Sequence, residues 1–183
     1  RIVTSAANDL ATNLSAAIAN HDDPATVRAG GPAYLLMLDG MIHGDPENEP
    51  LLLKGASLYS TYGAAFVEEP ERARRLSTKA LDYAERALCL HDTDDCGLRQ
   101  ASFESFRVRV QTIEREEVPF FYTLGSTWAG WIQAHREDLE AVADIARVEA
   151  IMQRIVALDE HYRDGGAHRY LGVFAILVPP ALG

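Results

Sequence analysis

A chain of 183 residues is long enough to bury one sizeable hydrophobic core, and a 48% apolar share is that of a folded protein. The formal net charge of −10 excludes the basic surface that binding to nucleic acid or to an anionic membrane requires. No segment reaches the roughly 20 apolar residues of a membrane span, because the nearest approach, 171–182, contains Pro179 and Pro180. Residues 1–20 do not resemble a targeting segment, since they include Asp9 and several asparagines, so we expect any signal peptide to have been removed.

The first half of the chain has the apolar spacing of helices throughout, with apolar residues three or four positions apart. The first predicted helix carries a stripe from Leu10 to Ile18, and His21-Asp22-Asp23 before Pro24 predicts a stop and a restart. Three more helices follow: a second that ends at Gly44-Asp45-Pro46, a third over Leu51–Phe66, and a fourth that begins near Pro70 and reaches Leu90.

The second half continues the same pattern. It predicts a helix from Phe103 to about Arg115, one that begins at Pro119 and includes Trp128 and Trp131, one from Leu139 to Leu158, and a last one from about His168 to Val178. No alternating run of four or more residues predicts a strand. We therefore expect an all-α fold of about eight helices, mostly in antiparallel pairs.

Two parts of the sequence match each other at a separation of about 70 residues. Gly55 lies 32 residues before Ala87, and Gly125 lies 32 residues before Ala157. Other matched pairs are Ala80 and Ala150, Leu81 and Ile151, Leu88 and Leu158, and His91 and His161. Small residues at fixed places let helices approach closely, and such a period is typical of stacked helical hairpins in a superhelix. The repeat predicts a single helical-repeat domain over residues 1–183 that holds a ligand or a partner.

Cys89 and Cys96 lie seven residues apart, on either side of an Asp-rich loop. A disulfide across this loop is sterically reasonable and would indicate an oxidising compartment. Two independent thiols are an equally open alternative. A zinc site with His91 is disfavoured, because no second pair of ligands follows at the required spacing.

The sequence has no pattern that predicts catalysis. It contains neither a Gly-rich phosphate loop nor a Gly-x-Ser-x-Gly elbow. Its carboxylates and arginines are spaced as ordinary surface ion pairs. We therefore expect no enzyme activity, no catalytic residue, no cofactor and no metal.

Aromatic residues provide the candidate binding site. The segment 120–122 presents three consecutive rings, which one helix face cannot bury together. Core packing is the alternative for some of these rings, but the concave faces of helical repeats carry aromatic residues where a ligand lies. We predict a mainly apolar cavity lined by Tyr59, Tyr62, Tyr122, Trp128 and Trp131.

Four groups of segments suggest a family. They are LLL at 51–53 leading into YSTYGAAFV at 59–67, DYAERAL at 82–88, VPFFY at 118–122 leading into WAGWI at 128–132, and MQRIVALDE at 152–160 followed by GAHRYLG at 166–172. In order and spacing they resemble the T component (TatT) associated with tripartite ATP-independent periplasmic (TRAP) transporters. The resemblance extends from about Val27 to Gly183.

The resemblance implies a periplasmic protein of tetratricopeptide-like helical hairpins, lipid-anchored in its full-length precursor. It implies a partner, the TRAP substrate-binding protein, and a homo-oligomer, which is a trimer in the best-described case. It also implies a cavity for a hydrophobic ligand. The sequence departs from the family in having no lipobox Cys at its N-terminus and in stopping at Gly183, where the family continues into another helix. We expect either that the C-terminal hairpin is truncated or that another subunit covers the final helix. The alternative function is a general tetratricopeptide-like scaffold for protein–protein interaction.

Overall fold

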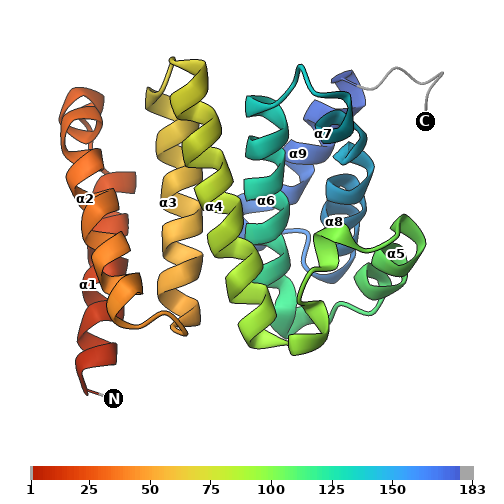
Figure 1. The fold of residues 1–183 in the computed structure, drawn as a ribbon, viewed down its shortest axis with the longest axis horizontal. Helices are drawn as coiled ribbons and strands as arrows, with labels where there is room; N and C mark the ends of the chain where they lie inside the picture. Colours follow the sequence, from red (N-terminus) through yellow and green to blue (C-terminus); the bar gives the residue numbers. More distant parts are fainter. Residues whose placement is uncertain (1, 178–183) are drawn as a thin grey trace. The chain divides into compact units, whose positions relative to one another are not determined.

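A computed structural model describes residues 2–177, which form α-helices and short 3₁₀ helices and no strand (Figure 1). The expected all-α fold is confirmed for these residues. The chain divides into two compact units, Arg1–Cys96 and Gly97–Gly183. The expectation of one helical-repeat domain over residues 1–183 stays a prediction.

The first unit contains four long helices, and capping side chains lie at the starts of the last three. They are α1 (Ile2–Ala19), α2 (Pro24–Gly44), α3 (Glu49–Phe66) and α4 (Pro70–His91), followed by the 3₁₀ helix η1 (Thr93–Asp95). The Asp23 carboxylate accepts hydrogen bonds from the first backbone N–H groups of α2, Asn48 does so for α3, and Glu69 for α4. The predicted breaks before Pro24 and near Pro70 are therefore confirmed.

Close approach of helices forms the core of the first unit, where α2 packs on α3 and α3 packs on α4. A Cβ added at Gly55 of α3 would lie 2.9 Å from Ile42 of α2 and 2.9 Å from the ring of Tyr83 of α4. No side chain fits there without displacing a neighbour, so glycine is needed at this crossing. On the other side of α2, the Tyr34 hydroxyl donates a hydrogen bond of 2.6 Å to the Ala11 carbonyl of α1.

The second unit is arranged around one helix, α8, which packs against α5, α6, α7 and α9. Its elements are η2 (Leu98–Gln100), α5 (Phe103–Gln111), η3 (Arg115–Glu117), α6 (Val118–Ala134), α7 (Leu139–Ala143), α8 (Ile145–Leu158) and α9 (Tyr162–Leu177). A Cβ added at Gly125 of α6 would lie 2.8 Å from Met152 and 3.2 Å from Ile151, both of α8. Gly55 in the first unit and Gly125 in the second therefore each lie where two helices meet.

Two predicted helices have different bounds in the structure. The helix expected to reach about Arg115 ends at Gln111, and the buried Ile113 lies in the turn that follows. The helix expected over Leu139–Leu158 is divided at Asp144, whose N–H bonds to the carbonyls of Ala141 and Val142. Buried apolar residues occur on both sides of this division, at Ala141 and from Val148 onward, so apolar spacing alone does not reveal it.

The last helix begins earlier than expected and starts irregularly. Arg163, Asp164 and Gly165 have φ values of 52°, 54° and 70°, in the left-handed region, so the regular part of α9 follows them. A left-handed turn over residues 163–165 thus precedes the regular part of α9. The predicted end at Val178 lies outside the described residues.

Candidate functional site

The predicted ligand residue Tyr59 lies in a polar cluster around the Asp39 carboxylate of α2. The Tyr59 hydroxyl donates to Asp39 Oδ2 at 2.8 Å, and the Tyr83 hydroxyl donates to Asp39 Oδ1 at 2.7 Å. Lys79 forms an ion pair with the same carboxylate, and its ammonium lies 5.0 Å from the centre of the Tyr59 ring. The cluster joins α2, α3 and α4, and Tyr59 is only 4% exposed.

The ionisation of both tyrosines follows from this environment. Burial, followed by the hydrogen bond to the Asp39 carboxylate, raises the pKa of Tyr59 and of Tyr83 above its ordinary value of 10.0. Both phenols are therefore protonated at neutral pH and act as hydrogen-bond donors. The cluster stabilises the helices, and these hydroxyls are not available as general bases.

Tyr62 lies near the end of α3 and is 5% exposed. Its hydroxyl donates to the Arg28 carbonyl at 3.0 Å, and its ring packs directly against Gly31 of α2. The Phe66 ring lies 5.5 Å away, centre to centre. Tyr62 thus fills the junction between α2 and α3.

Trp128 is completely buried in the second unit. Its indole Nε1 donates to Asp144 Oδ2 at 3.1 Å, and its ring meets Phe106 edge-on at 5.9 Å. The indole therefore holds Asp144, the residue between α7 and α8, in place. This hydrogen bond accounts for a polar residue at the division that apolar spacing does not predict.

Trp131 lies three residues further along α6 and is half-buried. Its ring stacks on His135 at 4.4 Å with an interplanar angle of 27°. The Arg99 guanidinium lies 5.4 Å from the Trp131 ring and 5.9 Å from the Trp128 ring. Trp131 is thus the ring of this pair that reaches the surface, flanked by a histidine and an arginine.

Tyr122 is also half-buried and belongs to a separate aromatic group. Its ring centre lies 5.2 Å from that of Tyr162 and 6.3 Å from that of Tyr170, both of α9. Gly166 lies against its hydroxyl end, where a side chain would not fit. Burial raises the pKa of the Tyr170 phenol above its ordinary value.

The five predicted ligand residues are therefore divided between the units. Tyr59 and Tyr62 belong to the first and are core residues, whereas Tyr122, Trp128 and Trp131 belong to the second. Trp128 and Trp131 share a neighbour, Arg99. The apolar cavity stays a prediction.

Sequence reasoning did not identify the charged partners of these rings. Asp39 is the only acidic residue within α2, which was an available signal for a buried role. Lys79, Arg99 and His135 had no such signal, because each sits in a segment with ordinary surface composition. Their positions over the rings depend on tertiary packing.

A shallow polar depression lies on α4 in the first unit. Its volume is about 460 Å³, and it is lined by Glu71, Arg74, Arg75, Thr78, Lys79 and Asp82. The lining is charged, so the depression is not the apolar cavity that the sequence predicts. It suits a polar segment of another molecule better than an apolar ligand.

Cys89 and Cys96 form a disulfide in the structure, with their Cα atoms 4.4 Å apart. The bond closes the end of α4 onto the turn that contains η1. His91, the third residue of the zinc alternative, has its Nδ1 3.4 Å from Glu49 Oε2. The two sulfurs are thus joined to each other instead of facing a shared metal position.

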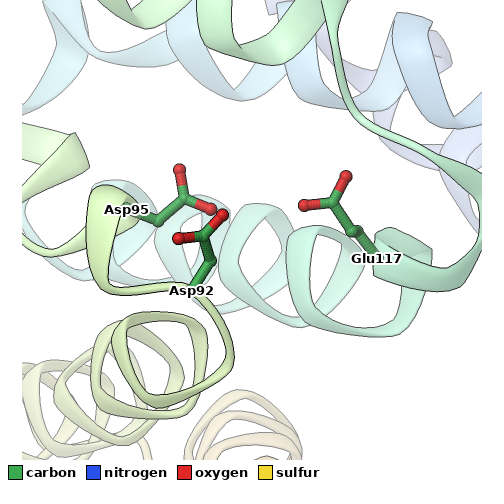
Figure 2. A group of neighbouring side chains, drawn as sticks. All are labelled: Asp92, Asp95 and Glu117. Atoms are coloured by element: carbon green, nitrogen blue, oxygen red, sulfur yellow. The ribbon is translucent and has the colours of Figure 1, made fainter.

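Three carboxylates are drawn in Figure 2, Asp92 and Asp95 from the first unit and Glu117 from the second. Asp92 accepts the N–H of Asp94 at 2.9 Å at the end of the first unit, where Asp95 is buried. Glu117, in the second unit, accepts the N–H of Glu114 at 2.7 Å and pairs with Arg109. We assign no metal site to these groups.

The comparison with protein families decides the identity at the family level. Residues 20–183 match the family model described as TRAP transporter T-component. The chain belongs to this family. No curated protein matches the sequence.

A TRAP transporter T-component is an accessory component of a transport system, and its family is not a known enzyme family. The membership places the protein in a TRAP transport system, in the periplasm or in association with the membrane. Across the part of the chain that the structure describes, no helix is both long enough and apolar enough to cross a bilayer.

Proposed function

We propose that this T-component is a non-catalytic periplasmic protein that binds the substrate-binding protein of its TRAP transporter and shelters a hydrophobic ligand. We further propose that it assembles as a homo-oligomer, a trimer by family resemblance, and is lipid-anchored in its precursor. The observation that carries the proposal is the family match over residues 20–183, which includes all but the first of the nine α-helices of the described chain.

The disulfide supports the periplasmic location. Thiols are kept reduced in the cytosol, whereas a bond such as that between Cys89 and Cys96 persists in an oxidising compartment such as the bacterial periplasm. The bond closes a short surface loop. Cys89 is half-buried and Cys96 is exposed. Mass spectrometry of the periplasmic fraction, with and without reductant, should show a mass difference of two hydrogens.

Partner binding is tested by native mass spectrometry of the mature protein, alone and with the substrate-binding protein encoded beside it. The expected result is a defined homo-oligomer that takes up stoichiometric copies of the partner. A co-purifying ligand would add its own mass. A monomer that does not bind this partner at micromolar concentrations would contradict the transport role.

The ligand site is tested through tryptophan fluorescence. Trp131 is half-buried between His135 and Arg99, whereas Trp128 is completely buried, so a ligand near the surface should change the emission of Trp131. We expect medium-chain carboxylic acids or lipids to shift or quench the emission of the wild-type protein and to leave that of Trp131→Phe unchanged. Absence of any change at all concentrations would remove the support for a cavity lined by the five aromatic residues.

The polar depression on α4 favours a second candidate function, a general scaffold for peptides. Three cationic side chains lie between two anionic ones along one helix face, and such a surface can pair with a charged segment. Charge reversal of Arg75, which is exposed there, would reduce binding to such a peptide. The substrate-binding protein itself is the first partner to test against this variant.

A further inference from the structure

The first helix, α1, is attached to the first unit by a small buried surface. It packs on α2 and α3, at the opposite edge of the unit from α4 (Figure 1). Of the α1 side chains that the structure describes, residues 5–18, only Ala11 is completely buried. The helix α3 has the same length of 18 residues and buries six of them. The described part of α1 therefore contributes less to the core than its neighbour does.

Hydrogen bonds hold the centre of α1 in place. The Tyr34 hydroxyl of α2 donates to the Ala11 carbonyl at 2.6 Å and lies 3.2 Å from Ser15 Oγ. Near them, Asn8 Oδ1 is buried, and no residue that the structure describes donates a hydrogen bond to it. A buried acceptor without a donor costs free energy. Asn8 therefore weakens the docking of the helix that carries it.

The face of α1 that packs on α2 and α3 is uncharged. Asp9 is the only charged residue of α1, and it is exposed. Small and apolar side chains recur along the packed face at helical spacing, together with two polar ones. These residues, none of which is exposed, are Ala7, Asn8, Ala11, Leu14, Ser15 and Ile18. The surface of α2 and α3 under α1 thus accepts an uncharged helix with a small residue near Tyr34.

The helix α2 begins without a contribution from α1. Residues 20–23, which connect the two helices, are all exposed. Asp23 caps α2 by accepting the N–H groups of Ala25 and Thr26, and its own N–H donates to His21 Nδ1 at 3.0 Å. The match to the family model also begins at residue 20, after the end of α1. The connection can therefore change its course while the start of α2 stays capped.

We propose that α1 is an autoinhibitory helix, which covers a helix-binding surface of α2 and α3 until a helix of a partner protein replaces it. The replacing helix is uncharged on its contact face and has a small residue near Tyr34, as α1 does. An amphipathic helix that lays its apolar face on a hydrophobic surface is a recurring mode of protein recognition. The inference goes beyond the proposed function, because it assigns a binding surface and the chemistry of its ligand.

Asn8 is the reason that another helix can replace α1. Residues 20–23 tether α1 beside its surface and so give it a high effective concentration there. A free helix lacks this advantage and needs better contacts than α1 makes. An apolar residue at the position of Asn8 leaves no buried acceptor without a donor. We therefore expect the partner's helix to match α1 at Ala11 and to differ from it at Asn8.

Labelled peptides of residues 5–19 test this surface on the full wild-type chain. They carry the α1 sequence, the same sequence with Asn8→Leu, and the latter with Ala11→Glu in addition. By fluorescence anisotropy, we expect the Asn8→Leu peptide to bind at least about tenfold tighter than the α1 peptide, and the Ala11→Glu peptide not to bind. Equal affinity of all peptides would overturn the inference. So would the absence of binding by the Asn8→Leu peptide at roughly millimolar concentration, which is the effective concentration of a tethered helix.

The same substitution in the chain should have the opposite effect on peptide binding. Asn8→Leu in the full chain should hold α1 more firmly and weaken binding of the Asn8→Leu peptide by at least about tenfold. Asn13→Leu is the matched control, because Asn13 is exposed on the same helix, and this variant should bind the peptide like the wild type. Circular dichroism checks that both variants keep their helices. An Asn8→Leu chain that binds the peptide as tightly as the wild type would refute the displacement of α1.

Hydrogen exchange locates the bound peptide. With the Asn8→Leu peptide bound to the wild type, backbone exchange should become faster in residues 5–18 and stay unchanged in α3. Unchanged exchange in residues 5–18 would mean that the peptide binds elsewhere and would refute the inference. Binding of the substrate-binding protein is measured separately by calorimetry. A chain that binds the peptide but not this protein would contradict the proposed function and leave the helix-binding surface in place.

Discussion

The α3–α4 pair and the α6–α8 pair solve the same packing problem with different chemistry. In each, a glycine lets one helix approach the next: Gly55 faces the Tyr83 ring, and Gly125 faces Met152 and Ile151. The first pair is held by hydroxyl and ammonium groups around a carboxylate. The second is held by buried apolar side chains and one indole hydrogen bond. Both pairs therefore share a close approach of the helix backbones at a glycine, whereas the side chains around the two contacts differ.

The connections of the two pairs also differ. Residues 67–69 join α3 directly to α4, whereas α7 and its flanking turns separate α6 from α8. A short connection restricts two helices to neighbouring positions, so the pairing of α3 with α4 depends less on specific side-chain contacts. The longer one depends on the contact between Trp128 and Asp144. Four experiments test this contrast.

Removal of the Trp128 side chain should have the largest effect. Trp128→Ala leaves a cavity among completely buried residues and frees Asp144 from its indole donor, so we expect the free energy of unfolding to fall by about 3–5 kcal/mol. Urea denaturation measures the change. Trp131→Ala is the control, and it should cost much less because that ring is half-buried. Equal losses of stability in the two variants would contradict the larger contribution that we assign to the buried Trp128.

The polar pair is tested at Asp39. Asp39→Ala leaves two buried hydroxyls and an ammonium without their acceptor, and we expect a loss of about 2–4 kcal/mol. Asp39→Asn retains one acceptor oxygen and should lose less. A double-mutant cycle with Lys79→Met separates the ion pair from the two phenol hydrogen bonds. An Asp39→Ala variant as stable as the wild type would show that the polar cluster does not stabilise the α3–α4 pair.

The two glycines give the most direct contrast. At Gly55 the added methyl group meets the Tyr83 ring, which is fixed by its hydrogen bond, so Gly55→Ala should cost about 1–3 kcal/mol. At Gly125 it meets the flexible end of Met152, which moves at little cost, and alanine favours the helix. Gly125→Ala should therefore change stability by less than about 1 kcal/mol in either direction. Thermal denaturation under identical conditions ranks the two, and the reverse order would contradict the packing argument.

The smallest effect is on pH dependence. Because burial raises the pKa of Tyr59 and Tyr83 in the folded state, their contribution to stability is complete below pH 10.0, where the unfolded chain begins to ionise, and is lost as the pH rises further. Ultraviolet titration of the folded protein should show phenols that ionise later than free tyrosine. Tyr59→Phe should remove one of them. Normal titration of every tyrosine would mean that the cluster is open to water.

Capping and apolar spacing explain most of the agreement between sequence and structure. Pro24 and Pro70 lie at helix starts as expected, because proline lacks the N–H that a first turn leaves unused. The apolar spacing predicts that Ile113 lies in a helix, but this buried residue lies in the turn after α5. The candidate ligand residues show the same limit, since a buried ring and a ring that lines a cavity have the same sequence pattern.

The sequence alone determined that the chain is helical, where most helices start, and that Gly55 and Gly125 occupy corresponding places. Each of these depends on local dihedral preferences or on spacing along the chain. Tertiary structure decided that Asp39 gathers two tyrosines and a lysine, that Asp144 divides a helix, and that Tyr34 bonds to the backbone of α1. These outcomes depend on which distant side chain completes a hydrogen bond or covers an apolar surface, and sequence distance does not encode that partner.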